Sequence, residues 1–505
     1  MRSKILAACL VAIQVVSTYA QTNMTIVKTK NGLLQGITEA SGIHSFKGVP
    51  FAQPPVGNLR WQEPQAPKNW EGVRKADHFG PQAMQPHIYA DMIFRSDGVS
   101  EDCLYLNVWT PAKTVNEKLP VLVYFYGGGF LAGDGSEYRY DGESMAKRGI
   151  VAVTVNYRLG IFGFFAHPEL SKASGYHGSG NYGLMDQHAA LLWVQQNIAA
   201  FGGDPGKVTI GGESAGAMSV CAQVASPLSK GLFRAAIAES GSLMGGLAPT
   251  PLAKAEQNGV AFMERNKIAS LTDLRNMPAE QLMKLGGRFS VDVDGYLLPD
   301  QPLAIFEAGK QMHVSLLAGW NSSEADVHGF LGNNVPITVA DYQKAVQKAY
   351  AGHADEVLKL YPAANDAEVA QVATDLATDR FMGYATWKFG DLQSKTGGGV
   401  PVYRYFFKRQ RPNTTGFGAV HSAEIEYALG NLSTNKVYPW TADDYQISET
   451  MQSYFANFIK SGDPNGKGLP AWHRIPERMN IDVKSESTPD KNNNRYLFWD
   501  AAVKP

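Results

Sequence analysis

The sequence predicts an α/β protein built on a large, mostly parallel sheet with helices on both faces, and three observations support this class. Nearly continuous apolar runs of strand length, such as 121–126 and 150–157, are typical of strands buried on both faces. The segments between these runs are long enough for helices, for example 186–200, whose predicted inward-facing residues are Leu191, Leu192, Val194 and Ile198. The chain of 505 residues is also 44% hydrophobic, which supplies enough apolar side chains for a large core.

The predicted elements follow one another without a repeat or a break in composition, so a single domain over 21–505 is the simplest organisation. Residues 25–110 alternate short strand-like pieces with Pro- and Gly-rich turns, which predicts antiparallel strands leading into the larger sheet. Two helical stretches within 336–395 are expected to pack over the sheet as a cap, and a further amphipathic helix around 447–458 stops at Gly462. The buried strands are expected at 121–126, 150–157, 208–210, 235–238, 314–318 and 400–407.

The first twenty residues predict a secretory signal peptide. A basic start over 1–4 precedes an apolar run over 5–16 and a small-residue exit over 17–20, so cleavage is expected after Ala20. About twelve apolar residues are too few for a membrane anchor, which needs about 20, so no stable membrane insertion is expected. The mature protein is therefore expected to be secreted or periplasmic.

Charge and cysteine content argue against two further classes of protein. Loss of Arg2 and Lys4 with the signal peptide leaves 44 basic and 47 acidic residues and no basic run, which argues against nucleic acid as a partner. Cys103 and Cys221 remain, so stability cannot depend on a disulfide framework, and Cys221 is predicted to be a buried apolar thiol. The oligomeric state stays open.

The stretch 208–224 carries the main candidate for chemistry. A short β-branched run leads into the sequence Gly212-Glu-Ser-Ala-Gly216, and a segment that can be helical follows. In a G-x-S-x-G turn between strand and helix, the small neighbours of the serine allow a sharp bend that exposes its hydroxyl above the sheet. Ser214 is therefore the candidate nucleophile.

A serine nucleophile needs a base that removes its proton and an acid that holds the base. In the α/β-hydrolase fold these follow the serine along the chain, the acid first and the histidine last. His421 lies in a loop of small residues after the last predicted buried strand, which is the position expected of the base. The other candidates considered, which lack this position, are His328, His353 and His473.

The acid and the oxyanion-binding groups come from two other loops. Glu324 and Asp326 both follow the 314–318 strand, and either carboxylate could orient the imidazole. The glycines 127–129 directly follow the 121–126 strand, and their backbone N–H groups could approach a developing oxyanion without side-chain obstruction. This run lacks the spacing and the Lys-Ser/Thr of nucleotide-binding loops, so no cofactor is expected, and the proposed chemistry needs no metal.

These motifs together resemble those of the type B carboxylesterases, the cholinesterase-like α/β-hydrolases. The matching signatures extend over nearly the whole mature chain, at 46–52, 101–107, 126–130, 156–160, 180–187, 201–205, 211–217 and 461–465. The resemblance implies an α/β-hydrolase fold and a serine enzyme that hydrolyses a small carboxylic ester. The roles that it implies are Ser214 as nucleophile, His421 as base, Glu324 as acid in preference to Asp326, Gly128, Gly129 and Ala215 as oxyanion hole, and Glu213 and Ser240 as a buried polar network beside the triad.

The chain departs from the family pattern in three places. Ala83 stands where many members have the cysteine that pairs with the position of Cys103, so that disulfide is missing. The loop between these two positions contains no Trp, the residue with which cholinesterases hold quaternary ammonium, and this argues against a choline ester. Ala325 stands where the family usually has Gly, next to the implied acid.

Two alternatives to a secreted serine esterase remain at this stage. The first is a catalytically silent adhesion or binding protein on the same scaffold, since fold alone does not prove activity. Silent relatives typically lose the serine or the histidine, and this chain keeps both, together with the acid. The second is a long-chain lipase, which would need an exposed apolar lid.

Overall fold

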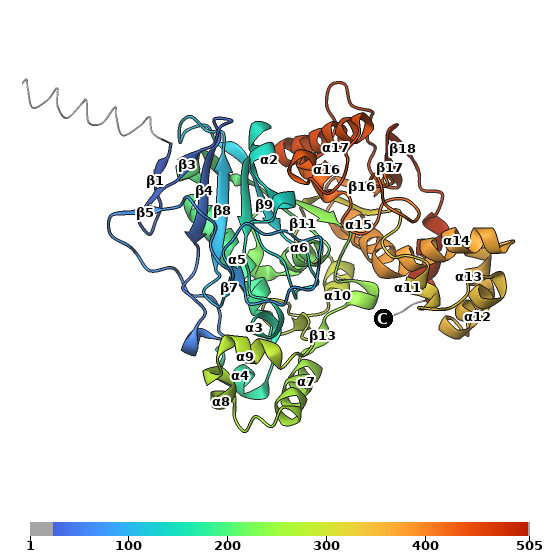
Figure 1. Cartoon of the computed structure of the whole chain (residues 1–505), viewed down its shortest axis with the longest axis horizontal. Helices are drawn as coiled ribbons and strands as arrows, with labels where there is room; N and C mark the ends of the chain where they lie inside the picture. Colours follow the sequence, from blue (N-terminus) through green and yellow to red (C-terminus); the bar gives the residue numbers. More distant parts are fainter. Residues whose placement is uncertain (1–23, 503–505) are drawn as a thin grey trace, which may run out of the picture.

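The computed structural model describes residues 24–502, so the predicted signal peptide over 1–20 lies outside the described residues. The main sheet of this part of the chain has 11 strands in the order β18-β17-β16-β15-β12-β11-β9-β10-β8-β4-β3 (Figure 1). The strands are β3 (Ile37–Thr38), β4 (His44–Pro50), β8 (Tyr105–Thr110), β9 (Leu119–Phe125), β10 (Val151–Val155), β11 (Gly203–Glu213), β12 (Ala235–Glu239), β15 (Ser315–Asn321), β16 (Val402–Phe407), β17 (Glu477–Ile481) and β18 (Glu486–Pro489).

The centre of the sheet is parallel, as predicted. All neighbours from β10 through β9, β11, β12, β15 and β16 to β17 pair in parallel, and β11 lies in the middle of the strand order. Every residue of β10 and of β12 is buried, which explains why these strands are apolar without alternation. Because parallel strands end at one edge of the sheet, the loops after β9, β11, β15 and β16 meet there.

Antiparallel pairs lie at both edges of the main sheet. β3, β4 and β8 form the predicted N-terminal antiparallel strands, whereas the antiparallel pair of β17 and β18 was not expected from the sequence. Some of the predicted N-terminal strands instead form small separate sheets. The short strands outside the main sheet are β1 (Ile26–Lys28), β2 (Leu33–Gln35), β5 (Val73–Lys75), β6 (Gln82–Ala83), β7 (Val99–Ser100), β13 (Thr250–Pro251) and β14 (Asp292–Val293).

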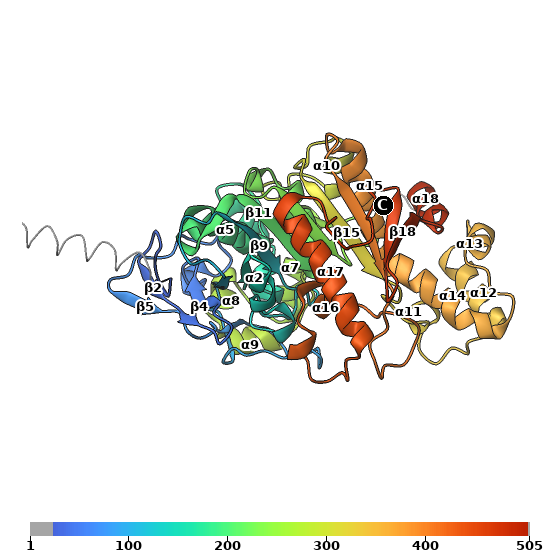
Figure 2. The ribbon, with the colours of Figure 1, turned by 90° about the horizontal axis from the view of Figure 1, so that it is seen from above.

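Helices cover both faces of the sheet (Figure 2). One face carries α5, α6, α10 and α15, and the other carries α2, α16 and α17. The helices are α2 (Glu143–Lys147), α3 (Gly160–Phe164), α4 (Pro168–Ala173), α5 (Tyr182–Asn197), α6 (Ala215–Ala225), α7 (Leu252–Arg265), α8 (Leu271–Asn276), α9 (Ala279–Lys284), α10 (Pro302–Glu307), α11 (His328–Leu331), α12 (Val339–Ala349), α13 (Ala354–Leu360), α14 (Asp366–Thr378), α15 (Tyr384–Thr396), α16 (Ile425–Leu429), α17 (Ala442–Ser461) and α18 (Asn493–Ala502). Within residues 24–502, no helix has the length and apolar character needed to cross a bilayer.

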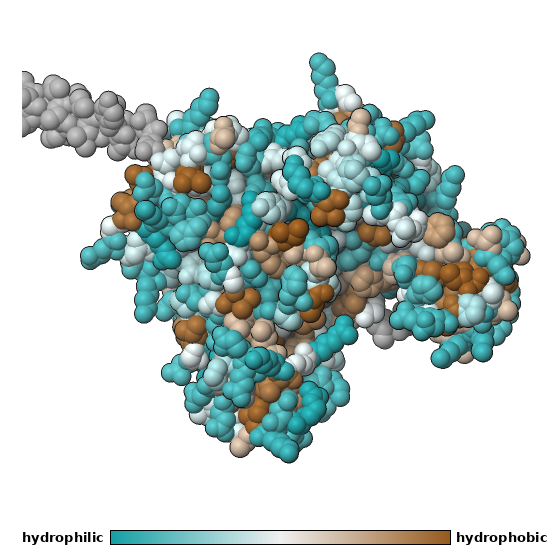
Figure 3. Space-filling model, in the orientation of Figure 1, coloured by the Kyte–Doolittle hydropathy of each residue, from teal (hydrophilic) through white to brown (hydrophobic). Residues whose placement is uncertain are grey.

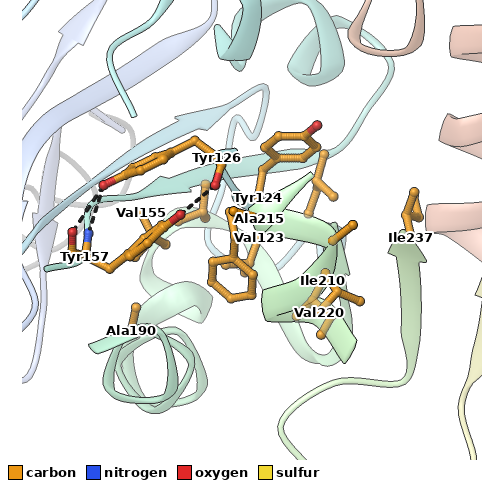
Figure 4. Packing of buried hydrophobic residues seen from close by; sticks show 14 of the residues in the cluster. Val123, Tyr124, Tyr126, Val155, Tyr157, Ala190, Ile210, Ala215, Val220 and Ile237 are labelled. Carbon is orange, nitrogen blue, oxygen red and sulfur yellow. Dashed lines mark hydrogen bonds between the residues drawn. The ribbon is translucent and has the colours of Figure 1, made fainter. Parts of the chain in front are cut away.

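Buried hydrophobic residues pack between the sheet and helices α5 and α6 (Figure 4). Tyr126 and Tyr157 stack there with ring centroids 4.4 Å apart, and each hydroxyl donates to the backbone carbonyl of the other residue. Leu191 and Val194 of α5 are buried as predicted, whereas Leu192 is 39% exposed because it lies on the outer side of the helix. Cys103 and Cys221 are both buried free thiols, so Cys221 has the environment predicted for it.

The predicted helical cap over 336–395 is only partly correct. Helix α15 packs on β15, but α12, α13 and α14 pack mainly on one another and on Trp499 of α18 as a separate hydrophobic cluster. This cluster forms a lobe that stands out from the body, on a face that is mainly hydrophilic with separate hydrophobic patches (Figure 3). The amphipathic pattern had shown that one side of each helix is buried, but not which partner covers it.

Candidate active site

Ser214 stands on the sharp turn between β11 and α6, with φ 56° and ψ −119°. A non-glycine residue in this region is strained, and such strain persists only where the surroundings hold the backbone in place. Here the Ser214 N–H donates to the Glu239 carbonyl oxygen of the neighbouring strand end at 2.8 Å. The turn therefore presents Ser214 above the end of the central strand.

The glycines on either side of Ser214 are required by the close approach of β9. A methyl group on Gly216 would stand 2.0 Å from the Phe125 carbonyl oxygen, and one on Gly212 would stand 2.7 Å from the same atom. Both contacts are closer than real Cβ atoms tolerate against backbone. The G-x-S-x-G spacing thus lets the serine turn lie against the end of β9, where the run of glycines begins.

Three side chains that are far apart in sequence form one hydrogen-bonded chain. The Ser214 Oγ lies 2.9 Å from His421 Nε2, and His421 Nδ1 lies 2.6 Å from Glu324 Oε2. Because an ionised carboxylate only accepts, Nδ1–H donates to Glu324 and Nε2 is left to accept from the serine hydroxyl. Glu324 is 4% exposed and Ser214 is 8% exposed, so the chain is largely shielded from water.

The structure separates the two candidate acids. Glu324 contacts His421, whereas Asp326 is exposed and its carboxylate accepts from the Gly329 N–H near the start of α11. The Glu324 carboxylate is held from its other side, because its Oε1 accepts from the Asn321 N–H and from the Ser240 hydroxyl, each at 2.6 Å. Asp326 therefore has the role of a local helix cap.

Glu424 belongs to this network and was missed in the sequence analysis. It is fully buried, lies 3.0 Å from the Ser240 hydroxyl, and accepts from the Asn321 side-chain amide at 2.5 Å. Burial and the neighbouring Glu324 carboxylate raise the pKa of Glu424. Since Ser240 has a single hydroxyl hydrogen, it can donate to only one of the two carboxylates at a time. An acidic residue three positions after the candidate histidine was the available signal.

Glu213 lies on the other side of the imidazole. Its Oε1 is 3.4 Å from His421 Nε2, and this buried oxygen has no hydrogen-bond partner within the described part of the chain. Burial raises the pKa of Glu213, although the nearby His421 opposes this effect. Burial alone would lower the pKa of His421, but the Glu213 carboxylate and the hydrogen bond to Glu324 outweigh it, so the pKa of His421 is raised. The Glu213 carboxylate is therefore placed to stabilise an imidazolium that forms when Nε2 takes a proton.

The three residues expected to form the oxyanion hole all have backbone N–H groups that make no hydrogen bond within residues 24–502. Gly128 and Gly129 follow β9 with φ 106° and 65°, and Ala215 is the first residue of α6. A methyl group on the adjacent Gly127 would stand 3.2 Å from the Ser214 Cβ, which places the start of this glycine run beside the serine. Free donors beside a serine hydroxyl can stabilise negative charge.

These groups open into a cavity of about 620 Å³, a size typical of small-molecule sites. Ser214, His421, Gly128 and Gly129 all line it. Most of the remaining wall is apolar and comes from distant parts of the chain, namely Met92, Phe130, Leu131, Met218, Leu243, Leu247, Phe289, Val291, Phe381 and Met382. Phe381 lies on a short π-helical turn and contacts the His421 ring edge to face at 5.3 Å.

No metal-binding cluster accompanies the cavity. Among residues 24–502, no group of three or more His, Cys, Asp or Glu side chains could hold a metal ion. The carboxylates of Glu324 and Glu424 are instead used in hydrogen bonds to His421, Ser240 and Asn321.

Comparisons with known proteins show the family of the chain. The model of the carboxylesterase family matches residues 23–499. The chain is 34% identical to the fumonisin B1 esterase of Sphingopyxis macrogoltabida over 483 residues, which cover 90% of this chain and 85% of the relative. It is 33% identical to the para-nitrobenzyl esterase of Bacillus subtilis, covering 94% and 98% of the two chains, and 32% identical to liver carboxylesterase 1 of Oryctolagus cuniculus, covering 92% and 90%.

The family match covers nearly the whole chain, and it implies the α/β-hydrolase architecture described above. The relatives named here are at least 32% identical to the chain and are named as esterases. They also favour an enzyme over a silent binding protein. The chain belongs to the carboxylesterase family and is a carboxylic ester hydrolase.

Proposed function

We propose that this protein hydrolyses carboxylic esters through an acyl-enzyme formed on Ser214, with His421 as general base and Glu324 as the acid that orients it. The observation that supports the proposal is the hydrogen-bonded chain from Ser214 through His421 to Glu324, which opens into an apolar cavity. In addition, we propose that the chain is exported, because residues 1–20 have the composition of a signal peptide.

In the first half-reaction, Ser214 Oγ attacks the ester carbonyl carbon while its proton passes to His421 Nε2. The carbonyl oxygen becomes an oxyanion, and the N–H groups of Gly128, Gly129 and Ala215 are free to donate to it. The bond to the alcohol oxygen then breaks, and the alcohol leaves with the proton from His421. In the second half-reaction, water gives its proton to His421 and attacks the acyl-enzyme, which releases the acid and restores Ser214.

A partitioning experiment tests the acyl-enzyme. Esters of one acid with several alcohols are hydrolysed in the presence of methanol, which competes with water for the acyl group. If all substrates pass through the same acyl-enzyme, the ratio of methyl ester to free acid is the same for every leaving alcohol. A ratio that changes with the leaving alcohol would contradict a common covalent intermediate.

The pH dependence of kcat/KM tests the proposed base. Only the neutral imidazole can take the serine proton, so kcat/KM rises as the pH increases through the pKa of His421. Replacement of Glu213 by Gln removes a carboxylate whose charge raises this pKa, so the pKa falls and the acidic limb moves to lower pH.

The matched control is Asp91→Asn, which removes a cavity carboxylate that pairs with Arg139 and not with His421. We expect Asp91→Asn to leave the acidic limb of the kcat/KM profile at the same pH. An acidic limb that stays unchanged in Glu213→Gln would show that His421 is not the titrating base, or that Glu213 does not set its pKa.

A further inference from the structure

The wall of the active-site cavity contains two arginines, and they differ in how their charge is balanced. Arg139 is buried and pairs with Glu137 and, at 3.3 Å, with Asp91. Arg288 is exposed to the cavity and forms no ion pair or hydrogen bond with any residue over 24–502. Of the two arginines on this wall, Arg288 is thus the one whose guanidinium is left to meet a ligand.

The segment that follows Arg288 is anchored by packing and by a backbone hydrogen bond. Gly287 has φ 117°, and a methyl group there would stand 2.8 Å from the Phe289 ring. Phe289 packs edge to face on Phe165 and Phe262, with ring centroids 5.5 Å and 5.3 Å apart. Two residues after Phe289, the Val291 carbonyl oxygen accepts from the Thr250 N–H at 3.0 Å, next to the pairing of β13 with β14. Arg288 is therefore carried into the cavity wall by an anchored segment.

We propose that Arg288 binds a free carboxylate of the substrate, so that the enzyme prefers esters that carry a carboxylate on their acyl or alcohol part. The inference rests on the proposed function, because it needs the ester carbonyl to sit at Ser214. A guanidinium offers a planar pair of donors that matches a carboxylate, and charge-assisted pairs of this kind are about twice as strong as neutral hydrogen bonds. Glu213 also lines the cavity and lies beside His421, where its carboxylate would repel the same group.

Two matched pairs of esters test the inference and distinguish the two positions of the carboxylate. Monoethyl adipate against ethyl hexanoate varies the acyl part, and the acetyl ester of ω-hydroxyhexanoate against hexyl acetate varies the alcohol part. Hydrolysis is followed by the release of acid in a pH-stat. The wild-type protein is expected to prefer the carboxylate-bearing member in at least one pair, and that pair identifies the part of the substrate that faces Arg288.

Arg288→Gln is expected to lower kcat/KM for the preferred ester about tenfold, mainly through a higher KM, and to leave the neutral partner within about twofold. Arg288→Lys keeps the charge and should retain part of the preference. The control is Lys284→Gln, which removes an equal charge from an exposed residue of α9 that does not line the cavity, and no change is expected. Raising the salt concentration should reduce the wild-type preference and leave Arg288→Gln unaffected.

The inference is overturned if neither pair is discriminated by the wild-type protein, if Arg288→Gln slows both members of a pair equally, or if Lys284→Gln has the same effect. The neutral esters keep this result separate from the proposed function. The wild-type protein is expected to hydrolyse the neutral esters, and Ser214→Ala is expected not to. This comparison tests the nucleophile and does not depend on Arg288.

Discussion

Replacement of Ser214 by Ala is expected to lower kcat for a short-chain para-nitrophenyl ester by a factor of about 10⁴ to 10⁶. The substitution removes the oxygen that would form the acyl-enzyme, while the cavity, the free N–H groups and the buried network of Glu324 and Glu424 stay in place. A residual rate above that of water is expected, since binding and the oxyanion-stabilising groups remain. KM should change far less than kcat, because Ser214 contributes little to the wall that holds the substrate.

The matched control for this substitution is Ser290→Ala. Ser290 also lines the cavity, but its hydroxyl contacts Thr250 and not His421. We expect its kcat to stay within about twofold of the wild-type value, because surface changes away from the reacting atoms have small effects. Equal rates for the wild-type protein and Ser214→Ala would show that the nucleophile has been misassigned.

The second large effect is expected for Glu324→Gln, with a loss of about 10⁴ in kcat. Glu324 Oε1 accepts from the Asn321 N–H and from the Ser240 hydroxyl, so the Gln side chain must keep its oxygen on that side. Its NH₂ group then faces His421 Nδ1, which can only accept from it. The proton of the imidazole is forced onto Nε2, where it faces Ser214 and prevents Nε2 from taking the serine proton.

Asp326→Asn is the control for the choice of acid. Asp326 is exposed and caps α11, so its replacement should leave kcat within about twofold and change only local stability. Measured kcat values for the two variants, with the fold checked by circular dichroism, decide between the two carboxylates. A large loss in Asp326→Asn together with an active Glu324→Gln would reverse the assignment.

The fold could be predicted from the sequence wherever one local pattern has one structural meaning. Apolar runs over 150–157 and 235–238 can be satisfied only by strands buried on both faces, and the structure places β10 and β12 there. Within 336–395, two helical stretches were predicted where the structure has four helices, α12 to α15, and their packing was not recognised. An amphipathic stripe records that one side of a helix is buried, and it carries no information about whether the sheet or another helix covers that side.

In the site, too, residues with a local sequence pattern could be predicted, whereas residues whose role depends on their neighbours in space could not. Ser214 carries a local signal, because a strand, a turn with two glycines and a helix occur in one continuous segment. The choice between Glu324 and Asp326 required the resemblance to the family, because two carboxylates two residues apart cannot be ranked by spacing. For Glu424 the only sequence signal was its place three residues after His421, and its burial beside Ser240 is seen only in the structure. Arg288 carried no sequence signal, since its significance depends on the missing partner of its guanidinium.

The most direct test of the account is covalent labelling of the nucleophile. A para-nitrophenyl alkylphosphonate that mimics the tetrahedral intermediate is incubated with the protein, and the modified peptide is identified by mass spectrometry. We expect one adduct per chain, on the oxygen of Ser214, formed at a rate that falls strongly in His421→Ala. Loss of esterase activity with the adduct on any other residue, or full labelling of Ser214 in the absence of His421, would contradict the proposed arrangement of serine, histidine and glutamate.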